Sequence, residues 1–205
     1  MSITLAGRVM QVKPSPTLAV AAKAAQLQAE GHDVIGLGTG EPDFDTPLHI
    51  KQAAIAAINA GFTKYTPVDG IPELKRAICD KFKRDNGLDY QLNQILVSVG
   101  GKQSIYNLCQ AFISSGDEVL IPAPFWVSYP DIVLLAGGTP VIMPTTPASR
   151  YKITPAQLEK AITSRTKLFF INSPSNPSGI AYSYAELQAL GEVLRKHPQS
   201  ADCDR

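Results

Sequence analysis

Short apolar runs alternate along the chain with stretches in which apolar residues recur every three to four positions. Runs of strand length occupy residues 34–37, 95–99, 118–121, 139–143 and 166–172, and such runs bounded by turn residues are typical of buried strands. Helical periodicity fills the intervals at residues 18–30, 47–60, 72–86, 102–113, 127–136 and 184–195. This alternation predicts an α/β fold, in which a mostly parallel sheet carries helices on both faces.

Two of the helix starts carry a second signal. Thr154 precedes Gln157 by three residues, and Ser183 precedes Glu186 by three. This is the spacing of a capping box, in which each side chain bonds to the backbone of the other residue. We therefore expect one helix to begin after Thr154 and another after Ser183.

The apolar run that begins at Leu168 ends in the polar turn 172–179, which contains two X-Pro steps. A residue before proline is held out of helical geometry, so the turn is stiff. It follows the carboxyl end of a predicted parallel strand, where open α/β sheets bind ligands. Such a turn fixes the amide of Asn172 or Asn176 against a ligand, and an ordinary exit from strand to loop is the open alternative.

Composition narrows the classes of function. The chain has 205 residues, of which 44% are hydrophobic and 18% charged, with a net charge of +1, which argues against a nucleic-acid or membrane-surface role. No apolar run is long enough to cross a bilayer, and the first residues lack the layout of a signal peptide, so we expect a cytoplasmic protein. Its three cysteines and three histidines show no disulfide or zinc spacing, and no metal is expected.

A glycine junction, residues 98–103, follows one predicted strand and opens a helix. Backbone N–H groups and the helix dipole favour an anion there, and phosphate is the expected ligand. A nucleoside-triphosphate loop is disfavoured, because Leu96 and Gln103 stand where that motif needs glycine and a hydroxyl residue. The Gly36-x-Gly38-x-Gly40 run does not match the dinucleotide-binding fingerprint, because Glu41-Pro42 stands where the final glycine is needed. A plain strand-to-helix turn is the alternative.

Three further residues extend the phosphate signal. Trp126 follows a strand end, where an indole stacks on a planar ring or packs as a core aromatic. Asn176 can hydrogen-bond a ring hydroxyl, and Tyr65 can reach a phosphate oxygen. An anion site, an aromatic side chain that can stack on a ring and an amide donor together indicate a phosphorylated aromatic cofactor.

Six sequence blocks strengthen this interpretation. They are Lys-Pro-Ser-Pro-Thr at 13–17, Gly-Glu-Pro-Asp-Phe-Asp-Thr-Pro at 40–47, Lys-Tyr at 64–65, Gly-Gly-Lys-Gln at 100–103, Pro-Phe-Trp-Val-Ser-Tyr-Pro at 124–130 and Asn-Ser-Pro-Ser-Asn-Pro-Ser-Gly at 172–179. In this order they resemble the class I/II aminotransferases of fold type I, which use pyridoxal 5′-phosphate. The resemblance is greatest to the bacterial aspartate aminotransferase branch and implies the large domain of that fold, incomplete at its C-terminus.

The resemblance assigns cofactor-binding roles to five residues. Gly101 and Lys102 would offer backbone N–H groups to the phosphate of pyridoxal 5′-phosphate. Trp126 would stack on the pyridine ring, and Asn176 would donate to its phenolic oxygen. Tyr65 would reach the phosphate in a neighbouring subunit, which implies a homodimer. The family also tends to have cis peptide bonds before the prolines at 124 and 177.

Substrate-binding roles follow in the same way. Gly40 would contact the substrate through its backbone, and Trp126 and Asn176 would line the substrate site. Lys13 matches a position that helps to hold a distal carboxylate in some members. His32 replaces the basic residue that we associate with prephenate use, so the resemblance does not assign prephenate as a substrate.

The resemblance places four other groups beyond Arg205: the Schiff-base lysine, the aspartate that pairs with the pyridine nitrogen, a nearby tyrosine and the carboxylate-binding arginine. We therefore assign no catalytic residue within the chain and expect this polypeptide alone to hold cofactor weakly and not to transaminate. The expected division is an amino-terminal arm with part of a small domain at 1–45, a partial cofactor-binding large domain at 46–198, and a non-native or disordered tail at 199–205.

The expected function is that of an aminotransferase in amino-acid metabolism and biosynthesis. It would move an amino group between an aspartate-like amino acid and a 2-oxo acid through pyridoxal phosphate. Two alternatives remain open. One is a non-catalytic remnant that binds no cofactor, and the other is a different fold-type I enzyme, such as a β-lyase or a decarboxylase.

Overall fold

The computed structural model describes residues 4–38 and 40–198. By backbone contacts the chain divides into two compact units. One contains the described residues up to Pro14 and those from Gly101 onward, and the other is Ser15–Gly100. These units do not test the expected division of the protein at residue 45, which stays a prediction. The expected tail, 199–205, lies outside the described residues.

The Ser15–Gly100 unit is built from helices. They are α2 (Pro16–Ala29), α3 (Leu48–Asn59), α4 (Pro72–Asn86) and the short 3-10 helix η1 (Leu92–Gln94). The Ser15 hydroxyl caps α2 by accepting a hydrogen bond from the Leu18 N–H, as expected of a serine at an N-cap. Gly87 ends α4 in the left-handed conformation, which glycine adopts without a steric penalty.

Two of the predicted strands are wrong, those at 34–37 and 95–99, because both segments are irregular. The Val34 carbonyl accepts a hydrogen bond from the Gln28 side chain at 3.0 Å. The Val97 N–H donates to the Asp69 carbonyl of a turn at 3.1 Å. A strand needs a neighbouring strand for its backbone groups, and these two segments bond to a helix side chain and to a turn instead.

The other unit contains a parallel sheet of three strands. These are β1 (Glu118–Pro122), β2 (Thr139–Met143) and β3 (Thr166–Phe169), in the spatial order β2-β1-β3. Both neighbours of β1 run parallel to it. The strand predicted at 166–172 begins where expected but ends three residues earlier, at Phe169. The strand predicted at 139–143 is confirmed.

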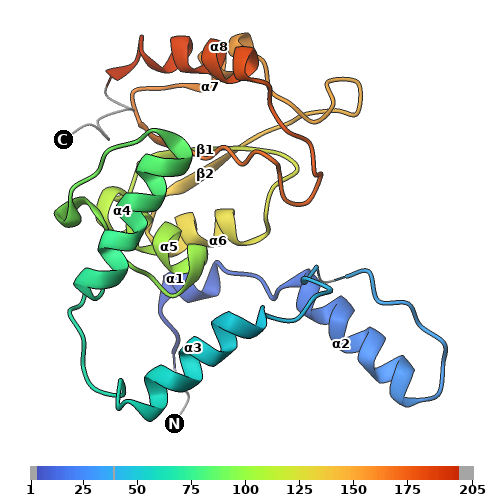
Figure 1. The fold of residues 1–205 in the computed structure, drawn as a ribbon. Coiled ribbons are helices and arrows are strands. Elements are labelled where there is room, and N and C mark those ends of the chain that lie inside the picture. The colour runs from blue at the N-terminus through green and yellow to red at the C-terminus, as the bar shows by residue number, and fades with distance from the viewer. Residues whose placement is uncertain (1–3, 39, 199–205) are drawn as a thin grey trace. The chain divides into compact units, whose positions relative to one another are not determined.

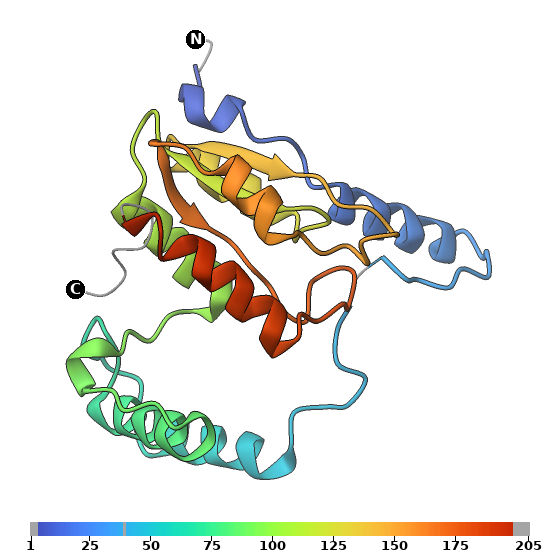
Figure 2. The same ribbon diagram turned by 90° about the horizontal axis from the view of Figure 1, so that it is seen from above.

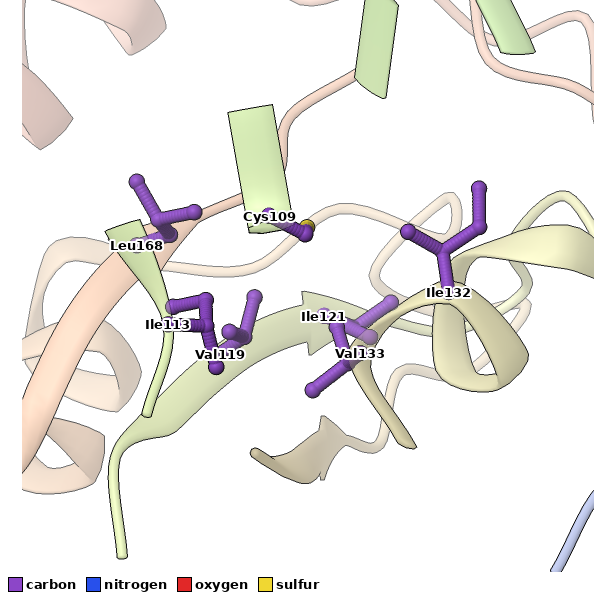
Figure 3. Packing of buried hydrophobic residues seen from close by; sticks show 7 residues of the cluster. All are labelled: Cys109, Ile113, Val119, Ile121, Ile132, Val133 and Leu168. Atoms are coloured by element: carbon purple, nitrogen blue, oxygen red, sulfur yellow. The ribbon is translucent and has the colours of Figure 1, made fainter. Parts of the chain in front are cut away.

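Helices cover both faces of this sheet. On one face lie α5 (Gly100–Phe112) and α6 (Ser128–Leu135), whose side chains pack on Val119 and Ile121 of β1 (Figures 1 and 3). On the other lie α7 (Pro155–Ala161) and α8 (Tyr184–Leu194), which pack around Leu120 and run side by side (Figure 2). Successive residues of a strand point to opposite faces, so β1 supplies both cores. The predicted parallel sheet with helices on both faces is confirmed.

The helix starts behave as the sequence predicts. Both capping boxes are present, Thr154 with Gln157 and Ser183 with Glu186. One boundary differs: Gly100 and Gly101 form the first turn of α5 rather than a separate turn before it. A four-residue helix, α1 (Gly7–Met10), was not predicted. No helix within 4–38 and 40–198 is long and apolar enough to cross a membrane.

Candidate cofactor and substrate site

The carboxyl ends of β1 and β3 meet at one edge of the sheet, because the two strands are parallel neighbours. Hydrogen bonds continue past both strands. The Phe170 N–H donates to the Leu120 carbonyl, and the Ala123 N–H donates to the Met143 carbonyl, both at 2.9 Å. The two turns that follow, 123–127 and 172–179, are therefore anchored to the sheet at the place where such folds bind ligands.

An aromatic chain extends across this edge. The Lys102 ammonium lies 5.0 Å from the centroid of the Trp126 ring system. Trp126 meets Tyr129 edge to face, with centroids 5.4 Å apart and an interplanar angle of 88°. Tyr129 in turn lies 5.1 Å from Phe170, beyond β3. Edge-to-face packing favours a fixed orientation of the indole. Because the Lys102 ammonium lies over that indole, the first turn of α5 and the Trp126 ring are close neighbours.

The turn 172–179 is closed by its own hydrogen bonds. The Asn172 Oδ1 accepts from the Asn176 N–H at 2.8 Å, and the Ser175 carbonyl accepts from the Gly179 N–H at 2.8 Å. The peptide bonds before Pro124 and Pro177 are cis, as the resemblance implied, and so is the bond before Pro174. The carbonyl oxygen of the Asn172 side chain therefore serves the backbone, whereas the Asn176 side chain is exposed and accessible to a ligand.

A narrow cleft joins the aromatic chain to this turn. Its wall includes Phe125, Tyr129, Phe170, Asn172, Asn176 and Tyr182. Partial burial raises the pKa of Tyr129 above its ordinary range, so its hydroxyl, which is a neutral donor at pH 7, stays protonated further into the alkaline range. The cleft has a volume of only about 20 Å³ and mixes aromatic and polar walls, so it borders the candidate site and does not itself enclose a ring.

The structure therefore brings together three of the predicted cofactor residues, Lys102, Trp126 and Asn176, at one edge of the sheet. Gly101 lies beside Lys102 in the first turn of α5. Their proposed roles stay predictions, since proximity alone does not show binding.

The other predicted residues lie elsewhere. Tyr65 and Gly40 belong to the Ser15–Gly100 unit, where both are exposed. Lys13 is exposed in the segment between α1 and α2. Their roles toward cofactor and substrate also stay predictions.

The sequence reasoning did not single out Tyr129, Phe170 or Tyr182. Tyr129 stands three residues after Trp126, in a turn where its N–H donates to the Trp126 carbonyl at 3.0 Å, and this short spacing was an available signal. Phe170 and Tyr182 are brought to the cleft by strand pairing and by the return of the chain after the turn. No local pattern reveals that.

Comparison with known proteins places this geometry in a family. Residues 32–200 match the family described as aminotransferase class I and II. The aspartate/prephenate aminotransferase of Nitrosomonas europaea is 66% identical over 194 residues, which are 95% of this chain and 49% of that protein. The solved aspartate aminotransferase of Rhizobium meliloti is 50% identical with a TM-score of 0.92, covering 97% of this chain and 50% of that one. The Thermus thermophilus enzyme with maleate is 46% identical with a TM-score of 0.91, over 96% of this chain and 51% of that one.

The chain belongs to the class I and II aminotransferases. Its solved relatives are aspartate aminotransferases of fold type I, so the fold class and the family expected from the sequence are both confirmed. The chain spans about half the length of the curated relatives it matches. Enzymes of this family depend on pyridoxal 5′-phosphate.

The described residues fit that cofactor. A Cβ at Gly101 would meet no atom within 4 Å, so the start of α5 is open to a phosphate, and the first N–H groups of a helix have no partner within the helix. Trp126 is partly exposed and offers a plate for the ring. Asn176 presents an amide nearby. Among residues 4–38 and 40–198, no group of three or more His, Cys, Asp or Glu side chains is placed to hold a metal ion.

Proposed function

We propose that the protein containing this chain transfers an amino group between an aspartate-like amino acid and a 2-oxo acid, and that this chain supplies the site for the ring and phosphate of pyridoxal phosphate. The approach of the Lys102 ammonium to the Trp126 indole, 5.0 Å from its centroid, carries the proposal. It joins an anion-binding helix start to an aromatic plate, which are the two features that a phosphorylated aromatic ring requires.

Each residue has a distinct task in this proposal. Gly101 and Lys102 bind the phosphate through backbone N–H groups, and the Lys102 ammonium adds a positive charge nearby. Trp126 packs on one face of the ring and excludes water from it. Asn176 donates a hydrogen bond to the phenolic oxygen and so fixes the ring's rotation. The bound cofactor supplies the electron sink that amino-group transfer needs.

The substrate assignment rests on the relatives. The Thermus thermophilus structure contains maleate, a dicarboxylate, and an aspartate-like substrate has the same two carboxylates. Gly40 and Lys13 are the proposed contacts of this chain with the substrate, together with Trp126 and Asn176. The Nitrosomonas europaea relative also carries prephenate in its name, so prephenate is the second amino acceptor to test.

Binding can be tested directly, because Trp126 is the only tryptophan of the sequence and its fluorescence reports on this site alone. The probe is pyridoxine 5′-phosphate, which has no aldehyde and cannot label surface lysines. We expect saturable quenching that inorganic phosphate reverses by competition, whereas pyridoxine without its phosphate binds more weakly. Absence of quenching at millimolar probe would overturn the proposed cofactor site on this chain.

Activity requires a polypeptide of the relatives' length that contains this chain. We expect it to convert aspartate with 2-oxoglutarate, measured by coupled oxaloacetate reduction. Loss of the 4-carboxylate of an amino acid without transfer of nitrogen would favour a decarboxylase instead, and elimination at the β-carbon would favour a β-lyase.

We also propose that this longer protein is a cytoplasmic homodimer in which Tyr65 reaches the phosphate of the partner subunit. The support is that Tyr65 is fully exposed within its own unit. If the proposal holds, Tyr65→Phe and Asn176→Ala subunits, each impaired alone, recover activity when refolded together, because one mixed site is then intact. Unchanged activity of the mixture would count against shared sites.

A further inference from the structure

Tyr182 connects the turn that carries Asn176 to the core on the opposite side of the cleft. Its backbone N–H donates to the Ser173 Oγ at 2.9 Å. Its hydroxyl accepts a hydrogen bond from the Ile153 N–H at 2.9 Å. Its ring packs against the core cluster around Leu120 and lines the same cleft as Asn176. One residue thus touches the turn, the cleft and the segment before α7.

We propose that Tyr182 is a positioning residue that sets the place of the Asn176 amide by clamping the turn 172–179 between Ser173 and Ile153. The inference rests on the proposed function, since it concerns the residue proposed to hold the ring's phenolic oxygen. Tyr182 acts through the turn and not through contact with the reacting atoms.

An ion pair between Lys152 and Glu186 supports the ring of Tyr182. The Lys152 ammonium lies 5.5 Å from the centroid of the Tyr182 ring and donates to both carboxylate oxygens of Glu186, at 2.9 and 2.7 Å. Glu186 is the third residue of α8 and accepts from the Ser183 N–H at 2.6 Å. The ring of Tyr182 is therefore held by a cation, which helix α8 fixes through its capping box.

The entry to the turn is anchored to the sheet by the bond from the Phe170 N–H to the Leu120 carbonyl. The turn's remaining hydrogen bonds, such as those of Asn176 to Asn172 and of Ser175 to Ile180, lie within residues 172–180. These bonds set the shape of the turn but not its place relative to the core. The Phe170 bond fixes where the turn begins, and the clamp by Tyr182 ties the return of the turn to the segment before α7. Burial raises the pKa of the Tyr182 hydroxyl, so the group stays protonated beyond the usual range of a tyrosine.

The first arm of the test needs no ligand. Amide hydrogen exchange by mass spectrometry is compared in the wild-type chain, in Tyr182→Phe, which removes the acceptor of the Ile153 N–H, and in Ser173→Ala, which removes the acceptor of the Tyr182 N–H. Tyr184→Phe, which deletes the same hydroxyl from an exposed ring two residues away, is the control. We expect exchange of the segment 172–182 to rise about three- to tenfold in both clamp variants, with α8 and the control unchanged.

The second arm measures affinity for pyridoxine 5′-phosphate through Trp126 fluorescence, in a double-mutant cycle with Asn176→Ala. If Tyr182 acts through Asn176, Tyr182→Phe weakens binding about three- to tenfold in the wild-type background and has no further effect in Asn176→Ala. The affinity for inorganic phosphate stays unchanged in every variant, which loss of the fold would not allow.

The outcomes separate the two ideas. Unchanged exchange of 172–182 in both clamp variants, or additive losses in the cycle, overturns the role of Tyr182. If the wild-type chain binds no pyridoxine 5′-phosphate, the proposed cofactor site fails, and the exchange arm still decides whether Tyr182 holds the turn.

Discussion

The Lys102 ammonium lies over the ring system of Trp126, 5.0 Å from its centroid. Lys102 belongs to the first turn of α5, and Trp126 to the turn after β1. These segments are separated by a whole helix and a strand, and folding brings a charge and an indole into contact at the edge where the strands end. The proposed site for a flat anionic ligand rests on this pair.

Replacing Lys102 with Met keeps the length of the side chain and removes its charge. We expect the affinity for pyridoxine 5′-phosphate to fall about three- to tenfold at low salt, because a nearby exposed charge contributes about 1 kcal/mol and is screened by ions. The wild-type affinity should also depend more steeply on salt than that of the variant. Fluorescence titration at two ionic strengths measures both quantities.

A matched control for Lys102→Met is Lys81→Met, because Lys81 also lies over an aromatic ring, that of Phe82 at 5.4 Å, and its loss changes the net charge equally. Equal weakening in the two variants would show that overall charge, and not this site, holds the ligand.

Glu118 begins β1 with a buried carboxylate, which accepts hydrogen bonds from the Thr163 hydroxyl at 2.6 Å and from the Arg165 guanidinium. Glu118→Gln leaves one of these donors without its acceptor, so we expect the free energy of unfolding at pH 7 to fall by about 1–3 kcal/mol. Urea unfolding measures it. The exposed Glu192→Gln is the control and should change stability by less than about 0.5 kcal/mol.

The same carboxylate gives a pH dependence. The Thr163 hydroxyl and then Arg165 lower the pKa of Glu118 in the folded chain. A lowered pKa contributes stability above the unfolded value of about 4.3, and this contribution is lost as pH falls through the folded value. Between pH 5 and 3 the wild type should therefore lose more stability than Glu118→Gln. Parallel acid curves would contradict this assignment.

Gly70 tolerates no side chain. Its φ is +104°, and a Cβ there would lie 2.4 Å from Cγ2 of Val97. Gly70→Ala combines backbone strain with a clash, so we expect a loss of about 2 kcal/mol or more from the Ser15–Gly100 unit. Gly36→Ala, where a Cβ meets nothing within 4 Å, is the control. Thermal unfolding followed by circular dichroism compares them, and an equal loss in the two would refute the clash.

Cys109 is fully buried in the core between α5 and the sheet. Burial raises the pKa of its thiol to about 11, so little thiolate forms at pH 8, and we expect labelling by iodoacetamide at least about tenfold slower than at the half-buried Cys79. Peptide mapping after labelling, with and without urea, measures this. Comparable rates without urea would contradict the packing.

The raised pKa of Cys109 also makes the free energy of unfolding depend on pH in the alkaline range. The unfolded thiol ionises from about 8.5, while the folded one stays protonated up to about 11. The unfolded state therefore binds fewer protons in this interval, and stability should fall as pH rises through it. The variant Cys109→Ala, which cannot ionise, should show a flatter alkaline limb in urea unfolding.

Local patterns were sufficient for most of the helices and for the three strands of the sheet. The capping boxes at Thr154 and Ser183 form as expected, because their signal lies within four residues. The apolar runs at 34–37 and 95–99 look the same in sequence as the true strands. They are irregular because their backbone groups bond to the Gln28 side chain and to the Asp69 carbonyl, and not to a neighbouring strand. No local pattern specifies such partners.

The candidate site divides in the same way. The residues alone indicated the glycine junction at 98–103, Trp126 and Asn176 as suited to a phosphorylated ring, and the family resemblance added Lys102 to that set. The resemblance selected Asn176 over Asn172, and the tertiary structure shows how the two differ, because the Asn172 side chain bonds to the backbone of Asn176 while the Asn176 side chain is exposed. The tertiary structure also brought Tyr129 and Tyr182 to the cleft. Contacts of this kind depend on strand order and on the return of the chain, and these are set by the packing of both cores around β1 rather than by neighbouring residues.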